Sequence, residues 1–303
     1  MSLYKYSYLA RNKDIEYLTR RLLEFPFPAR SIVNYIAAPS GSGKSACILQ
    51  AFLQSQNCKI KFTHYLYLAY DNNDKRCFTA MPHNPDSDPE VAEAQGANFM
   101  FKCLQVLLKT PDDPRAYIIQ LQKGELSTVE ETRESIASLL QDLIGEGFKC
   151  LVHIDEHRKM CSRDGSFVGS GTAFSRGAMK ALARVSGVTV VATYIDLPPL
   201  PPLGSSKVCR RPVMLPTLDI NKVIDAVTEL QFKYSDVSVL TPSQRRMFAT
   251  LRFRLAMKIV VNLGVVAVLH ERNTWAYAEE FLRKFQTAGD LEDVTEFSRT
   301  GCR

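Results

Sequence analysis

The stretch YIAAPSGSGKSACILQ, residues 35–50, decides how the rest of this sequence is interpreted. It contains Gly41 and Gly43, and Lys44 follows directly. Residues 30–38 have the β-branched and aromatic content of a strand, and the residues after Lys44 are typical of a helix. The order of strand, glycine loop and helix therefore distinguishes this segment from an ordinary Gly/Ser turn.

Such a loop can hold a phosphate group for two physical reasons. Glycines let backbone N–H groups turn toward one point, and the first N–H groups and the dipole of the following helix favour an anion. Lys44 would then place its ammonium on the β and γ phosphates, and the Ser45 hydroxyl would coordinate Mg²⁺. The phosphate-loop pattern has Gly where this chain has Ala38, whose methyl excludes only conformations with positive φ. The predicted phosphate-binding residues are Pro39, Ser40, Gly41, Ser42, Gly43, Lys44, Ser45 and Ala46.

A second motif, KCLVHIDE at residues 149–156, is an apolar run that closes in two acids. This pattern is typical of a central parallel strand whose carboxyl end opens on a site. Asp155 is predicted to hold Mg²⁺ through water, and Glu156 to orient and deprotonate an attacking water, a contribution of about 10²- to 10⁴-fold in rate. The alternative is a strand that simply ends in two solvated acids.

The remaining chain alternates between strand and helix patterns up to residue 219 and is helical beyond it. A capping box of Ser127 with Glu130 predicts a helix start, and residues 241–244 give another start signal. This order predicts an α/β fold with a doubly wound parallel sheet at 1–218 and an all-helical, lid-like C-terminal region at 219–303. Strands are expected at 59–70, 187–196 and 211–219, helices at 91–108, 128–144 and 173–184, a long loop at 71–90, and a proline-rich surface loop at 197–206.

Composition limits the class of protein. The 303 residues are 46% hydrophobic, which is enough for a sizeable core, and the eight cysteines have no pair two to four residues apart. We therefore expect reduced thiols in an intracellular compartment, cytoplasmic or nuclear. The most apolar later stretch, 255–269, is too short to span a bilayer and contains Lys258 and Asn262, so no membrane association is expected.

The positive charge is concentrated in one region. The net charge is +6, and residues 157–222 hold ten Lys/Arg against three acids. This excess can attract the phosphates of nucleic acid, or it can form a solvated basic face. The sequence leaves both interpretations open.

The order of motifs resembles the AAA+ and STAND group of P-loop ATPases over residues 10–270. Within that group PSGSGKS, YLYLAYDNNDKR and HIDEH are most similar to ATPase modules of Crinkler-type and retrotransposon-hot-spot-like proteins. The resemblance implies ATP and Mg²⁺ as cofactors and a homo-oligomer or protein partner. It also implies a polar sensor at the end of the fourth strand, Thr193 or else Asp196, although Thr193 can equally be a β-branched strand residue. Arg210 and Arg211, just before the fifth strand, match the place of a cation that reaches the γ phosphate.

Three functions follow from these motifs: an ATPase that couples hydrolysis to conformational change, a nucleotide-gated switch with negligible hydrolysis, and a small-molecule kinase. Glu156 favours the first, because a switch needs no base beside the Mg²⁺ ligand. His153 and His157 flank the acids but are expected on a strand and the loop after it, so neither is assigned to a metal.

Overall fold

In the computed structural model of the chain, the described residues are 12–24, 31–38, 43–70, 77–78, 88–109, 127–161, 170–194 and 208–215. They belong to one compact unit, Arg11–Thr217. The proline-rich stretch at 197–206, the helix signal at 241–244 and the apolar stretch at 255–269 lie outside the described residues. The division at residue 218 therefore stays a prediction.

A five-stranded sheet forms the centre of this unit, and all its strands run parallel in the order β2-β3-β4-β1-β5. The predicted α/β fold with a doubly wound parallel sheet is confirmed. The strand that precedes the glycine loop, β1, lies between β4 and β5, the last two strands that the structure describes. The strands are β1 (Ser31–Ala37), β2 (His64–Ala69), β3 (Cys150–Asp155), β4 (Val188–Tyr194) and β5 (Val208–Met214).

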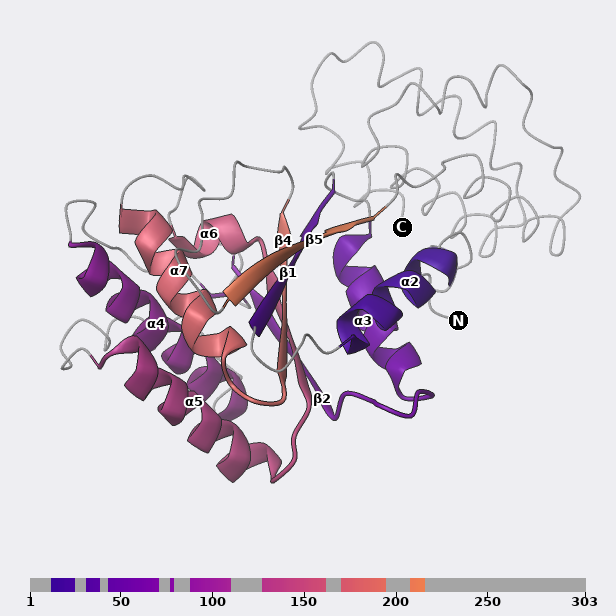
Figure 1. Ribbon diagram of the computed structural model, residues 1–303, viewed down its shortest axis with the longest axis horizontal. Coiled ribbons are helices and arrows are strands. Elements are labelled where there is room, and N and C mark those ends of the chain that lie inside the picture. The colour runs from indigo at the N-terminus through magenta and orange to yellow at the C-terminus, as the bar shows by residue number, and fades with distance from the viewer. Residues whose placement is uncertain are drawn as a thin grey trace, which may run out of the picture. The chain divides into compact units, whose positions relative to one another are not determined.

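Helices cover both faces of the sheet (Figure 1). The connection from β1 to β2 crosses the sheet in one direction, and the connections from β2 through β3 to β4 return in the other. Because such crossovers are right-handed, the two directions place their helices on opposite faces. One face carries α2 (Asn12–Leu23) and α3 (Lys44–Ser55), and the other carries α4 (Pro89–Lys109), α5 (Val129–Ile144), α6 (His157–Cys161) and α7 (Ser170–Ala183).

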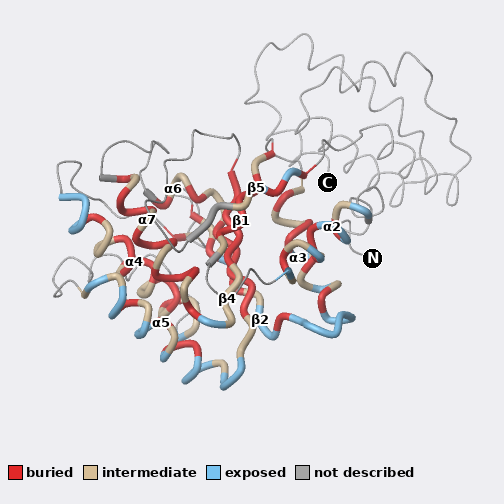
Figure 2. The backbone as a smooth tube through the Cα atoms, in the orientation of Figure 1, coloured by how far each residue is buried: buried red, intermediate tan, exposed pale blue. Residues whose placement is uncertain are grey.

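Alternate strand residues face the two helical layers. Leu68, Val152 and Val190 are fully buried and belong to the main hydrophobic core, which they form with α4, α5 and α7. The buried strands stand out in Figure 2. On the face toward α3 the buried strand residues include polar ones, and His153 and Thr193 have no exposed surface. A buried polar group must find hydrogen-bond partners, so this layer is where a site is expected.

Helices α4 and α7 pack with their backbones in close approach. A Cβ added at Gly96 would lie 1.9 Å from the carbonyl oxygen of Phe174, and one added at Gly177 would lie 1.9 Å from that of Glu93. The Glu93 carboxylate accepts a bond of 3.0 Å from the Lys180 ammonium across the same contact. Two glycines therefore set the distance between these helices.

Several predicted boundaries were wrong. The second strand begins at His64 rather than at residue 59, because the chain turns and bends over residues 56–60. The fifth strand is Val208–Met214 rather than 211–219. The fourth begins at Val188 rather than at residue 187, and its predicted end at 195–196 lies outside the described residues. Helix α2 was not predicted, and α4 and α7 begin two and three residues earlier than expected.

The predicted capping box was displaced by one residue. The N-cap of α5 is Thr128, whose hydroxyl accepts from the Glu131 N–H at 3.2 Å. The Glu131 carboxylate accepts in return from the Thr128 N–H at 2.8 Å. Ser127 and Glu130 fit the same sequence pattern, but Glu130 instead pairs with Arg184, the residue after α7, and with Arg133 of α5.

Candidate functional site at the carboxyl ends of the strands

Five of the predicted site residues, Lys44, Ser45, Asp155, Glu156 and Thr193, lie at the carboxyl ends of β1, β3 and β4. Gly43 has φ 82 and forms the N-cap of α3, so the helix begins at Lys44 directly after a left-handed turn that favours glycine. The dipole of α3 therefore points its positive end at this edge of the sheet. Of the eight predicted phosphate-binding residues, Gly43, Lys44, Ser45 and Ala46 are described, whereas Pro39, Ser40, Gly41 and Ser42 lie outside the described residues.

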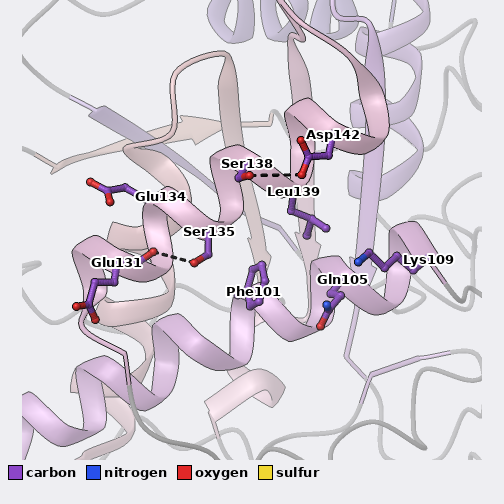
Figure 3. A pocket seen from close by; sticks show the side chains of 9 residues that line it. All are labelled: Phe101, Gln105, Lys109, Glu131, Glu134, Ser135, Ser138, Leu139 and Asp142. Atoms are coloured by element: carbon purple, nitrogen blue, oxygen red, sulfur yellow. Dashed lines mark hydrogen bonds between the residues drawn. The ribbon is translucent and has the colours of Figure 1, made fainter.

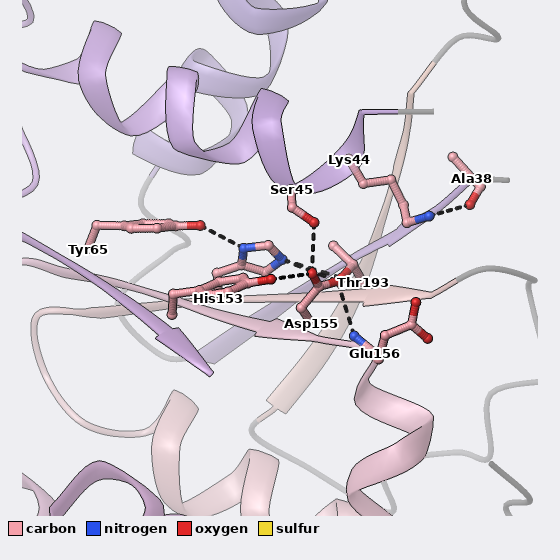
Figure 4. Close-up of polar contacts among 9 residues, drawn as sticks. Ala38, Lys44, Ser45, Tyr65, His153, Asp155, Glu156 and Thr193 are labelled. Atoms are coloured by element: carbon pink, nitrogen blue, oxygen red, sulfur yellow. Dashed lines mark hydrogen bonds and ion pairs between the residues drawn. The ribbon is translucent and has the colours of Figure 1, made fainter. Parts of the chain in front are cut away.

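Asp155 is the centre of the site and accepts four hydrogen bonds. Its Oδ2 accepts from the Ser45 hydroxyl at 2.8 Å and from the Tyr67 hydroxyl at 2.6 Å. Its Oδ1 accepts from the Thr193 hydroxyl and from the Glu156 N–H, the latter at 3.1 Å. The structure thus brings Ser45, Asp155 and Thr193 together (Figure 4).

These contacts determine the charge of Asp155. Burial works against its ionised form, but the influence of His153 and the hydrogen bonds from Thr193, Tyr67 and Ser45 outweigh it and lower the pKa. The carboxylate is therefore ionised at neutral pH. An ionised carboxylate next to a hydroxyl is an oxygen-only ligand set.

His153 supports Thr193 from within the buried layer. Its Nδ1 lies 2.8 Å from the Tyr65 hydroxyl and its Nε2 lies 3.3 Å from the Thr193 hydroxyl oxygen. Burial lowers the pKa of His153 to about 4, so the ring is neutral. The Thr193 hydroxyl donates its hydrogen bond to Asp155, so the Thr193 oxygen accepts from His153 Nε2–H. The other ring nitrogen, His153 Nδ1, then accepts from the Tyr65 hydroxyl. The hydrogen bonds therefore all point the same way: Tyr65 donates to His153, His153 donates to Thr193, and Thr193 donates to Asp155.

Lys44 lies beside Ser45 at the start of α3. Its side chain is buried, and its ammonium donates to the carbonyl oxygen of Ala38 at 2.6 Å. The Ala38 N–H in turn donates to the carbonyl of Tyr194, at 3.3 Å, which continues the pairing of β1 with β4. Ala38, the departure from the phosphate-loop pattern, therefore stands at the end of β1 and is in contact with the predicted phosphate-binding lysine.

Glu156 leaves β3 in an unusual conformation. It has φ 52, and it is the one non-glycine residue with positive φ in the described part of the chain. Its carbonyl accepts from the Lys159 N–H at 2.7 Å, which starts α6. Figure 4 shows its carboxylate turned toward the side on which Lys44 and Ala38 lie. Such strained positions often have a functional reason.

The two histidines near the acids belong to different surroundings. His153 lies in β3 and contacts Tyr65 and Thr193. His157 is buried at the start of α6 rather than in a loop, and its Nε2 lies 2.9 Å from the Ser175 hydroxyl of α7. Within the described residues, no group of three or more His, Cys, Asp and Glu side chains is placed to hold a metal.

Arg211 differs from its predicted position. It lies inside β5 rather than before it, where it pairs with Asn34 of β1. Its guanidinium donates to Asn34 Oδ1 at 2.8 Å and to the carbonyl of Arg21 in α2. It therefore joins α2 to the sheet and does not face Asp155. The side chain of Arg210 and the alternative sensor Asp196 lie outside the described residues.

Two tyrosines of the site were missed by sequence reasoning. Tyr65 and Tyr67 lie in β2, which pairs with β3 so that Tyr67 stands opposite His153. Their spacing of two residues is the signal that they share one face of the sheet. The register that brings that face to Asp155 cannot be read from either strand alone.

The donor set fits Mg²⁺ and a nucleotide phosphate. Mg²⁺ prefers oxygen ligands and keeps several waters, so it needs few protein ligands. The Ser45 hydroxyl donates its proton to Asp155, which leaves its oxygen lone pairs for a cation. Lys44 and the start of α3 supply positive charge next to these oxygens.

A concave region elsewhere on the unit has a different character (Figure 3). It is a shallow pocket of about 600 Å³ between α4 and α5. Glu131, one of its acids, is already engaged in the capping box of α5. The pocket is lined by Phe101, Gln105, Lys109, Glu131, Glu134, Ser135, Ser138, Leu139 and Asp142.

Comparisons with known proteins concern the fold. No family model matches the sequence, and no curated protein matches it. Among solved structures, the chain is similar to a chain of Drosophila ORC bound to DNA, with 14% identity and a TM-score of 0.47 over 92% of this chain and 61% of that one. It is also similar to the FIGL-1 AAA domain in complex with ADP, with 10% identity and a TM-score of 0.39 over 96% of this chain and 84% of that one. None of the helices that the structure describes is long and apolar enough to cross a membrane.

Proposed function

We propose that the protein is an Mg²⁺-dependent ATPase that couples hydrolysis to a conformational change. The observation that carries this proposal is the hydrogen bond of 2.8 Å between Ser45 and Asp155, which are 110 residues apart in the chain. It joins the start of α3, directly after the glycine loop, to the acidic end of β3. Two motifs that were proposed separately from the sequence thus share one point in space.

Binding of the nucleotide is assigned to the loop from Pro39 to Gly43 and the first residues of α3. The Lys44 ammonium would exchange the Ala38 carbonyl for phosphate oxygens, a charge-assisted contact that is stronger than a neutral one. Ser45 and Asp155 would hold Mg²⁺, Asp155 through water. When bound, Mg²⁺ would neutralise the negative charge that develops on the phosphate oxygens.

Hydrolysis is assigned to Glu156. Its carboxylate would orient a water and accept its proton, while the neighbouring Asp155 stays held by the Ser45 and Thr193 hydroxyls and the Glu156 N–H. Thr193 supports this division of roles, because it donates to Asp155 and is held by His153. Thr193 is thus proposed as the polar sensor that responds to the state of Asp155.

The finer assignment remains part of the proposal. The motifs resemble AAA+ and STAND ATPases, and within them Crinkler-type modules, which implies a helical lid at 219–303 and a homo-oligomer or protein partner. Because Arg211 is engaged by Asn34 and Arg21, any cation that completes the site would come from Arg210 or a neighbouring subunit. An intracellular location and nucleic-acid binding by the basic stretch at 157–222 are separate hypotheses, the latter tested by salt-dependent retention on DNA or RNA.

The proposal is tested by ATP turnover with and without Mg²⁺, together with ATP binding, for the wild type and for Glu156→Gln. Loss of the base should lower turnover by about 10²- to 10⁴-fold with binding preserved. Glu146→Gln, a change of an exposed acid in the turn before β3, is the matched control and should turn over like the wild type.

The outcomes separate the candidate functions. Turnover that depends on Mg²⁺ and on Glu156 supports the ATPase. Binding without turnover in the wild type points to a nucleotide-gated switch, and transfer of the phosphoryl group to a small molecule rather than to water points to a kinase. Absence of ATP binding contradicts all three.

A further inference from the structure

All four lone-pair positions of the Asp155 carboxylate are in use. An ionised carboxylate offers about four such positions, two on each oxygen. The hydroxyls of Ser45 and Tyr67 fill those of Oδ2, and the Thr193 hydroxyl and the Glu156 N–H fill those of Oδ1. For Asp155 to accept a bond from the water shell of a cation, one of these donors must leave.

The four donors differ in how firmly they are held. The Glu156 N–H belongs to the backbone at the end of β3. Thr193 has no exposed surface, and His153 holds its oxygen from the other side. Ser45 stands at the start of α3, where its oxygen would itself meet the cation. None of these three can give up its bond without moving the backbone or losing a function that the site needs.

Tyr67 is the donor that can move. Its side chain is 41% exposed, whereas Thr193 is completely buried. It lies in β2, which stands at one end of the strand order, so among the described strands it has β3 as its one neighbour. Its ring contacts the rings of Tyr65 and His153, at centroid distances of 6.3 and 5.1 Å. A rotation of this side chain would free one position on Oδ2.

We propose that Tyr67 is a gate residue of the metal site: its hydroxyl occupies Asp155 Oδ2 before Mg²⁺-nucleotide binds, and it leaves this oxygen when Mg²⁺-nucleotide binds. This inference rests on the proposed ATPase function and concerns regulation of the same site. The hydrogen bond of Tyr67 stabilises the metal-free site, so it opposes loading. Removing the hydroxyl removes this opposition, while Ser45 and Thr193 keep Asp155 oriented.

The test compares Tyr67→Phe with Tyr17→Phe. Both tyrosines are 41% exposed, but Tyr17 lies on α2 and its hydroxyl accepts from Arg21 Nε, away from Asp155. Calorimetric titration of ADP at a series of Mg²⁺ concentrations gives the Mg²⁺ concentration for half-maximal tightening of binding. Tyr67→Phe should lower this concentration by about tenfold, as expected for loss of a competing bond to a charged group. Tyr17→Phe should change it by less than about twofold.

A second measurement follows the side chain itself in a chain that keeps its hydroxyl. With 3-fluorotyrosine at position 67 alone, the ¹⁹F resonance should shift when Mg²⁺ and ADP are added together and stay in place with ADP alone. A resonance that is the same in both conditions overturns the gate. So does a Tyr67→Phe variant that needs as much Mg²⁺ as the wild type, or more.

Failure of the gate differs from failure of the proposed function. ADP binding that tightens with Mg²⁺ equally in the wild type and in Tyr67→Phe contradicts the gate and leaves the ATPase intact. If none of the three chains binds ADP at any Mg²⁺ concentration, the proposed function fails and the gate fails with it.

Discussion

At the scale of single residues, Glu156 combines an assigned chemical role with an unfavourable backbone. Its φ of 52 lies in the left-handed region, where a residue with a Cβ is destabilised by about 1–2 kcal/mol relative to the right-handed one. Asn tolerates this region better than other non-glycine residues. The backbone conformation at Glu156 therefore lowers the free energy of unfolding of the protein.

This predicts a difference between two variants that both lack the base. Glu156→Gln and Glu156→Asn replace the carboxylate by an amide, so both should lose turnover. The Asn variant should unfold at a higher urea concentration than the Gln variant, with a free energy of unfolding higher by about 0.5 kcal/mol, because Asn enters the left-handed region more readily. Equal midpoints, or a less stable Asn variant, would mean that the conformation at 156 carries no strain.

Arg211 provides a second prediction at this scale, because its position predicts that its loss lowers the stability of the protein and leaves ATP turnover unchanged. It satisfies the oxygen of Asn34, whose side chain is 1% exposed and whose amide nitrogen donates to the Val190 carbonyl at 3.0 Å. Arg211→Met leaves this buried oxygen without its donor, which should lower the free energy of unfolding by about 1–3 kcal/mol. Urea unfolding measures this loss, and ATP turnover per folded molecule should remain within about twofold. A fall in turnover of about 10³-fold with little loss of stability would instead identify Arg211 as the finger.

At the scale of elements, the contact of α4 with α7 depends on two glycines. A methyl group at Gly96 or at Gly177 would meet a backbone carbonyl oxygen at 1.9 Å, and a backbone atom cannot turn away as a side chain can. We predict that Gly96→Ala and Gly177→Ala each lower the free energy of unfolding by about 3 kcal/mol or more, since the helices must separate. Chemical denaturation measures the loss.

The control for this prediction is Ser135→Ala on the exposed face of α5, which should change stability by less than about 0.5 kcal/mol. Wild-type stability in either glycine variant would show that α4 and α7 can shift apart without loss. A large effect in the control would show that the measurement does not report on this contact.

The elements also show how far the sequence could be interpreted. The order of the strands and of α3, α4, α5 and α7 was predictable, because each of these elements has its own local pattern, whereas α2 and α6 were not predicted. The position of the cap on α5 was not, because Ser127 with Glu130 and Thr128 with Glu131 satisfy the same spacing. In the folded protein Glu130 pairs with Arg133 one turn along α5 and with Arg184, a residue of the α7–β4 connection that no local pattern links to it.

The same limit applies to the candidate site. The sequence motifs indicated Lys44, Ser45, Asp155 and Glu156, because each belongs to a segment that needs only its immediate neighbours to be recognised. Tyr67 reaches Asp155 through the pairing of β2 with β3, a register set by packing and not by either strand. Candidate site residues within a motif can therefore be recognised from the sequence, and contacts that arise between strands cannot.

At the scale of the whole molecule, burial should decide which thiols react. Cys103 and Cys150 are buried, and burial raises the pKa of each to about 12. At pH 8 about one in ten thousand of these buried thiols is then in the reactive thiolate form. Cys58 is exposed in the turn after α3. Brief treatment with iodoacetamide, analysed by mass spectrometry, should modify Cys58 and spare the two buried cysteines.

The same treatment in guanidinium chloride should modify all three cysteines, which shows that the folded structure protects the buried pair. Modification of Cys150 at the rate of Cys58 in the native protein would contradict the burial of β3. It would also place solvent within reach of the strand that ends in Asp155.

The strand order has a consequence for how the protein is made. Of the described strands, β1 is the first to leave the ribosome, yet its two neighbours in the sheet, β4 and β5, are the last two. Until about residue 194 has emerged, the strand before the glycine loop lacks both of these neighbours, while β2 and β3 can already pair with each other. A nascent chain that stops before β4 thus carries the phosphate-loop sequence without the sheet that supports it, and the proposed nucleotide site can form only late in the translation of this unit.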